Sequence, residues 1–269
     1  MVFRTIKYNK NKHIGLIKLN RPERMNAVNE TMYREIQEVL KNIKSDKNIR
    51  AIVITGSVLK RGNIVKQAFC AGADLKEHAA GKRSKAQRKK YIELAHETTR
   101  MIYEFPILTI AAINGPARGA GVEMALNCDF ILMANNATLA FTETSLGTFV
   151  GGGVTSHLPS IIGIAKAKEL IYTGKVISGR DAVDLGIALK SFPVKQLLNS
   201  TVTLAKELSE KAPVSMMFAK KILQNAKLLN IKEVLKHETE AILSCMETED
   251  WHEGIEAFME KRKPVYKGR

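Results

Sequence analysis

The spacing of apolar residues in the first half of the chain predicts strands that alternate with helices. Apolar and polar residues alternate over 13–20, which is the pattern of a half-buried strand. Apolar residues three or four positions apart follow over 30–46, so that they share one face of a helix. The β-branched run 49–56 is typical of a strand buried on both faces. This order predicts an α/β fold of repeated units.

The middle of the chain continues the pattern. Residues 84–105 predict a helix, and Ser84 and Gln87 at its start have the spacing of a capping box. The segment 57–67 has the composition of a polar loop, and 137–153 that of a strand, a turn and a glycine-rich loop. The other predicted elements are a strand, a helix and a strand, over 106–115, 120–127 and 129–134.

From about residue 196 onward the pattern is almost entirely helical. The four predicted helices cover 197–211, 212–229, 231–246 and 250–263. We therefore divide the chain into a core over 1–195 and a C-terminal helical region over 196–269.

Composition narrows the class of protein. The 269 residues, 45% of them hydrophobic, suffice for one large core. The three cysteines are scattered, which argues against a disulfide framework and indicates a reduced, cytoplasmic compartment. We expect no signal peptide and no membrane span, because no apolar run reaches the roughly 18 residues that a span needs. The net charge of +15 favours anionic partners: phosphorylated ligands, acidic surfaces or nucleic acid.

Two segments rich in small residues, 68–75 and 115–124, follow predicted strands. Their side chains are too small to cover the backbone N–H groups, and the second segment leads into a helix whose first N–H groups lack internal partners. Two such N–H groups that converge on one oxygen atom would form an oxyanion hole. A pair of ordinary turns is the alternative.

Two acids lie near the second of these segments in the sequence. Glu123 falls in the first turn of the predicted helix, and Glu143 follows the next strand. Carboxylates that share a small site raise each other's pKa and can divide acid and base roles. The alternatives are a helix-dipole role for Glu123 and a solvated loop position for Glu143.

Other catalytic motifs are missing from the sequence. There is no Walker phosphate loop, no GxGxxG fingerprint, no HExxH or Cys/His metal spacing and no GxSxG elbow. A metal site or a serine-nucleophile triad is therefore poorly supported.

Six segments, in one order, resemble the crotonase, or enoyl-CoA hydratase/isomerase, superfamily over essentially the whole chain. They are LNRPERMNAV, AFCAGADLKE, AAINGPARGAGVEMALNCDF, ATLAFTETSLGTFVGGG, YTGKVISGRDAVDLGI and EGIEAFMEKRKPVYKG. The resemblance implies a crotonase-like spiral of repeated ββα units, with C-terminal helices that build a homotrimer or a dimer of trimers. It implies an acyl-CoA substrate, no metal and no cofactor beyond the coenzyme A of the substrate.

The resemblance also implies roles for individual residues. The N–H groups of Ala73 and Ala120 would bind the thioester oxygen, and glutamate at both acid positions indicates a hydratase. This lyase would add water syn to a 2-enoyl-CoA, in fatty-acid or related acyl-CoA degradation. Glu123 would hold the water, and Glu143 would share it and exchange the proton beside the carbonyl. Substrate and CoA contacts are implied for Arg24, Met25, Ala71, Asp74, Leu75 and Lys76, and, from a neighbouring subunit, for Phe258 and Lys261.

Several residues depart from the usual pattern of the superfamily. Arg118 stands where an apolar residue is usual, and Ala120 where glycine is usual. Val150 and Val154 replace a common proline and glycine. We expect these residues to surround the acyl pocket. They indicate either an unusual acyl group, with Arg118 favouring a chain that carries a carboxylate, or another reaction on the same enolate chemistry.

Two other interpretations stay open. The chain could be an isomerase of the same fold, or a hydratase of a branched or dicarboxylic acyl-CoA. The basic helix start at 82–90 could also bind RNA, because one relative in the superfamily binds RNA through a lysine-rich helix. A solvated basic face is the alternative for that segment.

Overall fold

The centre of the structure, a computed structural model that describes residues 3–80 and 83–269, is a six-stranded sheet. The first pair of strands is antiparallel and the other pairings are parallel, with Ile17 opposite Ile54 across the second pairing. The strands, in spatial order, are β1 (Ile6–Asn11), β2 (Ile14–Leu19), β3 (Ala51–Gly56), β6 (Leu108–Ile113), β8 (Phe130–Ala134) and β11 (Lys190–Phe192).

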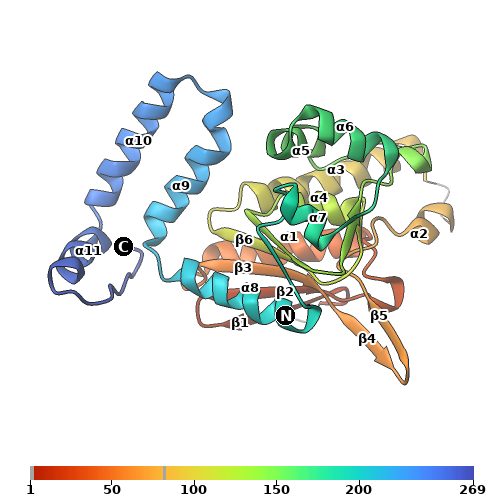
Figure 1. The fold of residues 1–269 in the computed structure, drawn as a ribbon, viewed down its shortest axis with the longest axis horizontal. Coiled ribbons are helices and arrows are strands. Elements are labelled where there is room, and N and C mark those ends of the chain that lie inside the picture. Colours follow the sequence, from red (N-terminus) through yellow and green to blue (C-terminus); the bar gives the residue numbers. More distant parts are fainter. Residues whose placement is uncertain (1–2, 81–82) are drawn as a thin grey trace.

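Helices cover both faces of this sheet. Every residue of β3 and β6 is buried, which explains their continuous apolar sequences. Helix α8 (Val194–Ser209) lies on one face and contacts five of the six strands. The helices α1 (Glu30–Ser45), α3 (Lys85–Tyr103) and α4 (Ala120–Leu126) lie on the other side (Figure 1). The predicted α/β fold is confirmed.

A second, three-stranded sheet stands beside the first and carries the small-residue segments. Its order is β10 (Ile177–Ser178), β9 (Thr138–Ala140) and β7 (Ala117–Arg118). Strand β7 runs parallel to β9 and leads directly into α4. The residues that follow β9 are thereby placed next to the start of α4.

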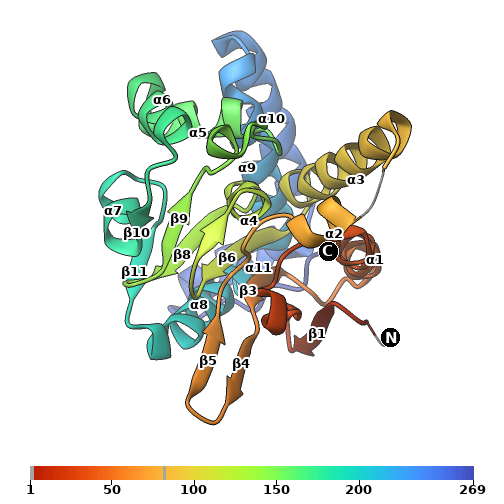
Figure 2. The same ribbon diagram turned by 90° about the vertical axis from the view of Figure 1, so that its right-hand side faces the viewer.

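The segment 57–67 is a β-hairpin, so the predicted polar loop is wrong. Strands β4 (Val58–Arg61) and β5 (Ile64–Gln67) pair antiparallel and project from the body of the protein (Figure 2). The two-residue turn contains Gly62 with φ of 57°, a conformation typical of tight hairpin turns. The hairpin was missed because apolar and polar residues do not alternate along its strands, whose sequences are VLKR and IVKQ.

The C-terminal helices form an arm that extends from the core. Helices α9 (Pro213–Asn225), α10 (Ile231–Met246) and α11 (Glu249–Met259) lie to one side of the sheet (Figure 1). All four helices predicted beyond residue 196 are present, but α8 packs on the sheet and not in the arm. The division at 195 and 196 stays a prediction.

The remaining elements are short. They are η1 (Pro22–Arg24), α2 (Leu75–Ala80), η2 (Thr144–Leu146), α5 (Val154–Ile162), α6 (Ile164–Thr173), α7 (Gly179–Asp184) and η3 (Ala226–Leu228). The predicted capping box of Ser84 and Gln87 is present at the start of α3. Across the described residues, no helix combines the length and apolarity that crossing a bilayer requires.

Candidate active site

The two small-residue segments meet at one place in the structure. Residues Cys70 and Ala117 form an isolated parallel bridge, in which the Arg118 N–H donates to the Cys70 carbonyl at 2.9 Å. A Cβ atom at Gly121 would lie 2.4 Å from that same carbonyl oxygen. The start of α4 therefore packs against the first segment more closely than any side chain would permit.

The backbone amides of Ala73 and Ala120 lie on this junction. In the described part of the chain, neither N–H donates a hydrogen bond, and both residues are partly exposed. Ala120 is the first residue of α4, and Gly119 before it has φ of 46°. Two unused donors at adjoining turns are what an oxyanion hole needs. The pair stays a prediction, which this geometry supports.

Two buried carboxylates border the junction. Glu123 is 8% exposed and Glu143 7% exposed. Glu143 follows β9, and its Oε1 lies 3.1 Å from the position that a Cβ at Gly119 would occupy. Glu123, from the first turn of α4, accepts a hydrogen bond of 2.7 Å from the N–H of Gly151. The fold thus brings together the two acids that the sequence singled out.

The two acids differ in their tendency to ionise. Burial raises the pKa of Glu123, whereas the Gly151 N–H acts against that rise. Burial, together with the neighbouring carboxylate of Glu123, raises the pKa of Glu143 to about 7. Neither buried oxygen of Glu143 has a hydrogen-bond partner in the described part of the chain. Of the two acids, Glu143 therefore holds its proton up to a pH of about 7, whereas the Gly151 N–H favours the ionised form of Glu123.

The site contains residues that the sequence interpretation did not single out. Gly151 supplies the donor to Glu123, and Asn127 binds the loop around Gly151. His96 of α3 lies close, with Nε2 2.9 Å from the position of a Cβ at Gly151. The available signal was an amide side chain, Asn127, one turn after Glu123 in an otherwise apolar helix.

Three of the residues implied for CoA binding lie on two segments joined by backbone hydrogen bonds. Arg24 is exposed at the end of η1, and Met25 follows it with φ of 53°. The Ala71 N–H donates to the Met25 carbonyl at 3.1 Å. All three thus lie beside the junction of the small-residue segments. Their contact with CoA stays a prediction.

Asp74 is held by protein groups. Its carboxylate accepts a hydrogen bond of 2.8 Å from Arg21, and it also accepts from the N–H groups of Lys76 and Glu77 at the start of α2. Leu75 is 57% exposed and Lys76 is also exposed. The side chains of Leu75 and Lys76 are therefore free to meet a ligand, whereas the Asp74 carboxylate orders the segment.

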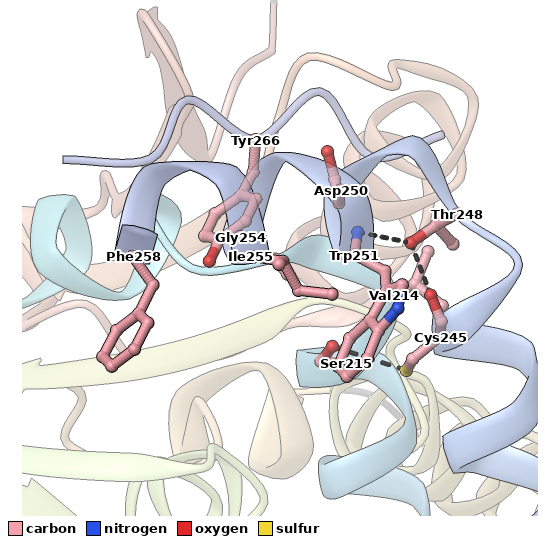
Figure 3. A pocket seen from close by; sticks show the side chains of 11 residues that line it. Val214, Ser215, Cys245, Thr248, Asp250, Trp251, Gly254, Ile255, Phe258 and Tyr266 are labelled. Atoms are coloured by element: carbon pink, nitrogen blue, oxygen red, sulfur yellow. Dashed lines mark hydrogen bonds between the residues drawn. The ribbon is translucent and has the colours of Figure 1, made fainter. Parts of the chain in front are cut away.

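Phe258 lies in α11 and Lys261 two residues after its end. Figure 1 shows α11 in the C-terminal arm, well apart from α4. Phe258 is 85% exposed and Lys261 is exposed too. Figure 3 shows Phe258 on the same side of α11 as Trp251 and Ile255, beside a pocket of about 420 Å³. One chain does not bring these two residues to its own acids, so their predicted role requires a second subunit.

The guanidinium of Arg118 is engaged within the second sheet. It donates to the backbone oxygens of Ala117 and Thr138 and to the Thr138 hydroxyl, at 2.8 to 3.0 Å. Three of its five N–H groups are used in this way. Arg118 therefore ties β7 to β9, and nothing in its contacts supports the predicted role toward an acyl carboxylate.

The basic segment 82–90 is described only from Arg83 onward, and Lys82 lies outside the described residues. Helix α3 begins at Lys85 and is exposed as far as Lys90. Within the described residues, no group of three or more His, Cys, Asp or Glu side chains has the arrangement of a metal site. RNA binding by this segment stays a prediction.

Comparison with known proteins gives consistent results. The profile of the family described as "Enoyl-CoA hydratase/isomerase" matches residues 9–269. A Bacillus subtilis protein named as an enoyl-CoA hydratase/isomerase, YngF, is 37% identical over 96% of both chains. The mouse mitochondrial methylglutaconyl-CoA hydratase is 33% identical over 96% of this chain and 81% of its own. The crystal structure of an enoyl-CoA hydratase from Bacillus anthracis, 35% identical, superposes with a TM-score of 0.92, covering 99% of this chain and 100% of that one.

Proposed function

The chain belongs to the enoyl-CoA hydratase/isomerase family, and from this premise we propose that it adds water to the double bond of a 2-enoyl-CoA thioester. One observation carries the proposal: two buried glutamates with different proton affinities border a junction of turns with two unused N–H groups. Hydration needs a base for water, an acid for carbon and a place for negative charge. The two glutamates and the two N–H groups would supply all three.

The first requirement is a place for the negative charge that develops on the thioester oxygen. The N–H groups of Ala73 and Ala120 would donate to this oxygen. Each would bind it more strongly as charge builds up, because the donors are fixed in place before the reaction. Loss of one such donor typically costs about 10²- to 10³-fold in rate.

The second requirement is the transfer of the elements of water. Ionised Glu123 accepts a hydrogen bond from the water and draws its proton as the oxygen forms a bond to C3. The electrons of the C2–C3 double bond move toward the thioester, and protonated Glu143 supplies the proton that forms the C2–H bond. This step leaves the proton from water on Glu123 and the negative charge on Glu143, and transfer of that proton from Glu123 to Glu143 would restore the starting state. The two acids on one side of the substrate would make the addition syn.

Substitution of either acid tests this function. We expect the purified protein to remove the conjugated-enoyl absorbance of crotonyl-CoA. Glu123→Gln and Glu143→Gln should each lower kcat by roughly 10²- to 10⁴-fold, because each removes a proton-transfer group but keeps the side-chain shape. Circular dichroism provides the control for folding. Full activity in both variants would contradict the mechanism.

The acyl group is a separate question. The similarity to methylglutaconyl-CoA hydratase supports a branched dicarboxylic acyl chain as a second candidate, and the family name includes isomerases. A panel of crotonyl-CoA, 3-methylglutaconyl-CoA and 3-enoyl-CoA distinguishes these options by the ratio of kcat/KM values. Appearance of conjugated-enoyl absorbance from the 3-enoyl substrate alone would identify an isomerase.

The proposal includes the partners and location expected from the sequence. We infer a homotrimer or a dimer of trimers, which the exposed apolar side chains of the arm support and in which Phe258 and Lys261 would approach the CoA of a neighbouring subunit. Coenzyme A enters as part of the substrate, and we propose no metal or other cofactor. A cytoplasmic location also stays a proposal, because several relatives are named as mitochondrial.

A further inference from the structure

We propose that Asn127 is a positioning residue, which ties the glycine loop 151–153 to α4 and so holds the Gly151 N–H on the Glu123 carboxylate. The inference rests on the proposed function for its kinetic consequence. Its structural part concerns only the contacts among these residues.

The contacts of Asn127 run to two separate segments. Its side-chain amide donates to the backbone oxygen of Glu123 at 2.8 Å and to the backbone oxygen of Gly152 at 2.6 Å. The residue is 3% exposed, so water does not compete for these bonds. Both amide hydrogens are used, one within α4 and one on a loop 25 residues further along the chain.

The second bond distinguishes this residue from an ordinary helix terminus. Asn127 is the C-cap of α4, and a bond to the Glu123 carbonyl alone would only satisfy a terminal carbonyl. The bond to Gly152 adds a link across the site, next to the residue whose N–H contacts the Glu123 carboxylate at 2.7 Å. Glu123 is thus connected to the loop twice. Its carboxylate accepts from the Gly151 N–H directly, and its backbone oxygen is linked to Gly152 through the Asn127 amide.

The glycine loop 151–153 is flexible by composition, so an additional bond is needed to hold it in one conformation. Gly152 and Gly153 have φ of 57° and 78°, and glycine backbones move readily among several conformations. The loop also fits closely: a Cβ at Gly152 would lie 2.8 Å from Glu123 Cβ and 3.3 Å from Thr99 Cγ2. Packing therefore limits the loop from two sides, but Asn127 supplies the directional bond that fixes its rotation.

The consequence is electrostatic. An N–H donor stabilises the ionised form of Glu123, so loss of that donor raises the pKa of this carboxyl beyond the rise that burial already causes. The other titratable groups near Glu123 are Glu143, His96 of α3, Tyr33 of α1 and Cys70. All four of these residues keep their identity in a variant of Asn127. A change in the pKa of Glu123 can then be assigned to the loop.

Two substitutions separate the roles of the amide. Asn127→Leu removes both bonds while keeping the approximate shape. Asn127→Ser can keep a bond to the Glu123 carbonyl within the helix, as serine hydroxyls commonly do with a carbonyl one turn earlier, but it is too short to bind Gly152. Thr99→Val is the matched control. Within the described residues the Thr99 hydroxyl donates to carbonyls of its own helix alone, and valine keeps the methyl group that packs beside Gly152.

The experiment measures the ionisation of Glu123 in two ways. In the acid limb of kcat/KM for crotonyl-CoA against pH, we expect both Asn127 variants to shift the apparent pKa upward by roughly one pH unit. The Thr99→Val variant should superpose on the wild type. A ¹³C titration of the Glu123 side-chain carboxyl, assigned through Glu123→Gln, should show the same upward shift without any substrate.

The outcomes are distinct. A wild-type pKa in Asn127→Ser would overturn the proposal, because the bond within the helix would then be sufficient. An equal shift in Thr99→Val would also overturn it, since general loosening of the site would explain the result. If the protein failed to hydrate crotonyl-CoA, the proposed function would be wrong, but the ¹³C titration would still decide the role of Asn127.

Discussion

At the scale of single residues, the two glutamates show how the same side chain takes different roles in one site. Glu123 has a donor, the Gly151 N–H, that favours its charged form. Glu143 has no hydrogen-bond partner in the described chain and faces Glu123, so its neutral form is favoured. The difference arises from the backbone around each residue and not from the residue type.

The neutral form of Glu143 predicts a dependence of stability on pH. Its pKa of about 7 in the folded protein exceeds the value of 4.5 expected for an unfolded chain. The stabilisation from the bound proton is therefore present below pH 4.5 and is lost as the pH rises to about 7. Glu143→Gln should remove this loss, so the variant should be more stable than the wild type at pH 8.

Urea denaturation at pH 5 and pH 8 measures this effect. The difference in unfolding free energy between variant and wild type should be larger at pH 8. Glu207→Gln, at an exposed position on the surface, serves as the control and should show little change. An equal difference at both pH values would mean that Glu143 is ionised throughout.

At the scale of secondary-structure elements, the arm is attached to the core through a buried ion pair. Lys220 of α9 places its ammonium 2.8 Å from Asp129 and 3.2 Å from the Ile107 carbonyl. Asp129 also accepts from the N–H and hydroxyl of Thr109 in β6. This network connects α9 to the sheet, and the Lys220 side chain is only 3% exposed.

We expect substitution of Lys220 to cause a large loss of stability. Lys220→Met leaves the Asp129 carboxylate without its cation, and breaking a buried pair in this way typically costs about 3–5 kcal/mol. Its neighbour Lys221 is exposed, so Lys221→Met is a matched control that should change stability by less than about 0.5 kcal/mol. Denaturant titration of both variants checks the prediction. Equal, small effects would show that the pair does not anchor the arm.

At the scale of the whole molecule, the arm exposes apolar surface that no other part of the described chain covers. On α10, Ile242 and Leu243 are 59% and 57% exposed, and on α11 the exposed fraction of Phe258 reaches 85%. Burial of such side chains is worth roughly 25 cal/mol per Å². A second copy of the chain is the occupant that the family resemblance implies for this surface.

We therefore expect charged substitutions on the arm to dissociate the oligomer. Sedimentation velocity should show the wild type as a trimer or a hexamer at micromolar concentration. The double variant Ile242→Glu, Leu243→Glu should shift the protein toward the monomer, because each new glutamate would bury a charge in the interface. Val65→Glu in the exposed hairpin is the control and should leave the mass unchanged. A monomeric wild type would contradict the expected assembly.

Features of the fold that depend on local patterns could be predicted from the sequence alone, whereas those that depend on contacts between distant segments could not. The spacing and the runs of apolar residues predicted the central strands and long helices, since a strand such as β3 must be mostly apolar along its length to lie between two helical layers. The hairpin at 58–67 escaped prediction because its exposed strands are specified by a tight turn and pairing rather than by burial. The candidate acids, Glu123 and Glu143, were also found in the sequence, through their place beside small-residue turns and through a family resemblance.

Only the tertiary structure decided how those residues act on one another. Cys70 and Ala117 are far apart in sequence, yet their pairing brings the two turns together. The Gly151 N–H reaches Glu123 across 28 residues, and Asn127 contacts that loop. Arg118, which stood out in the sequence as a residue for an acyl carboxylate, donates to Thr138, and its predicted role toward the substrate stays a prediction. Side-chain chemistry is local and can be read from the chain, whereas burial and hydrogen-bond partners depend on which distant segments the fold brings into contact.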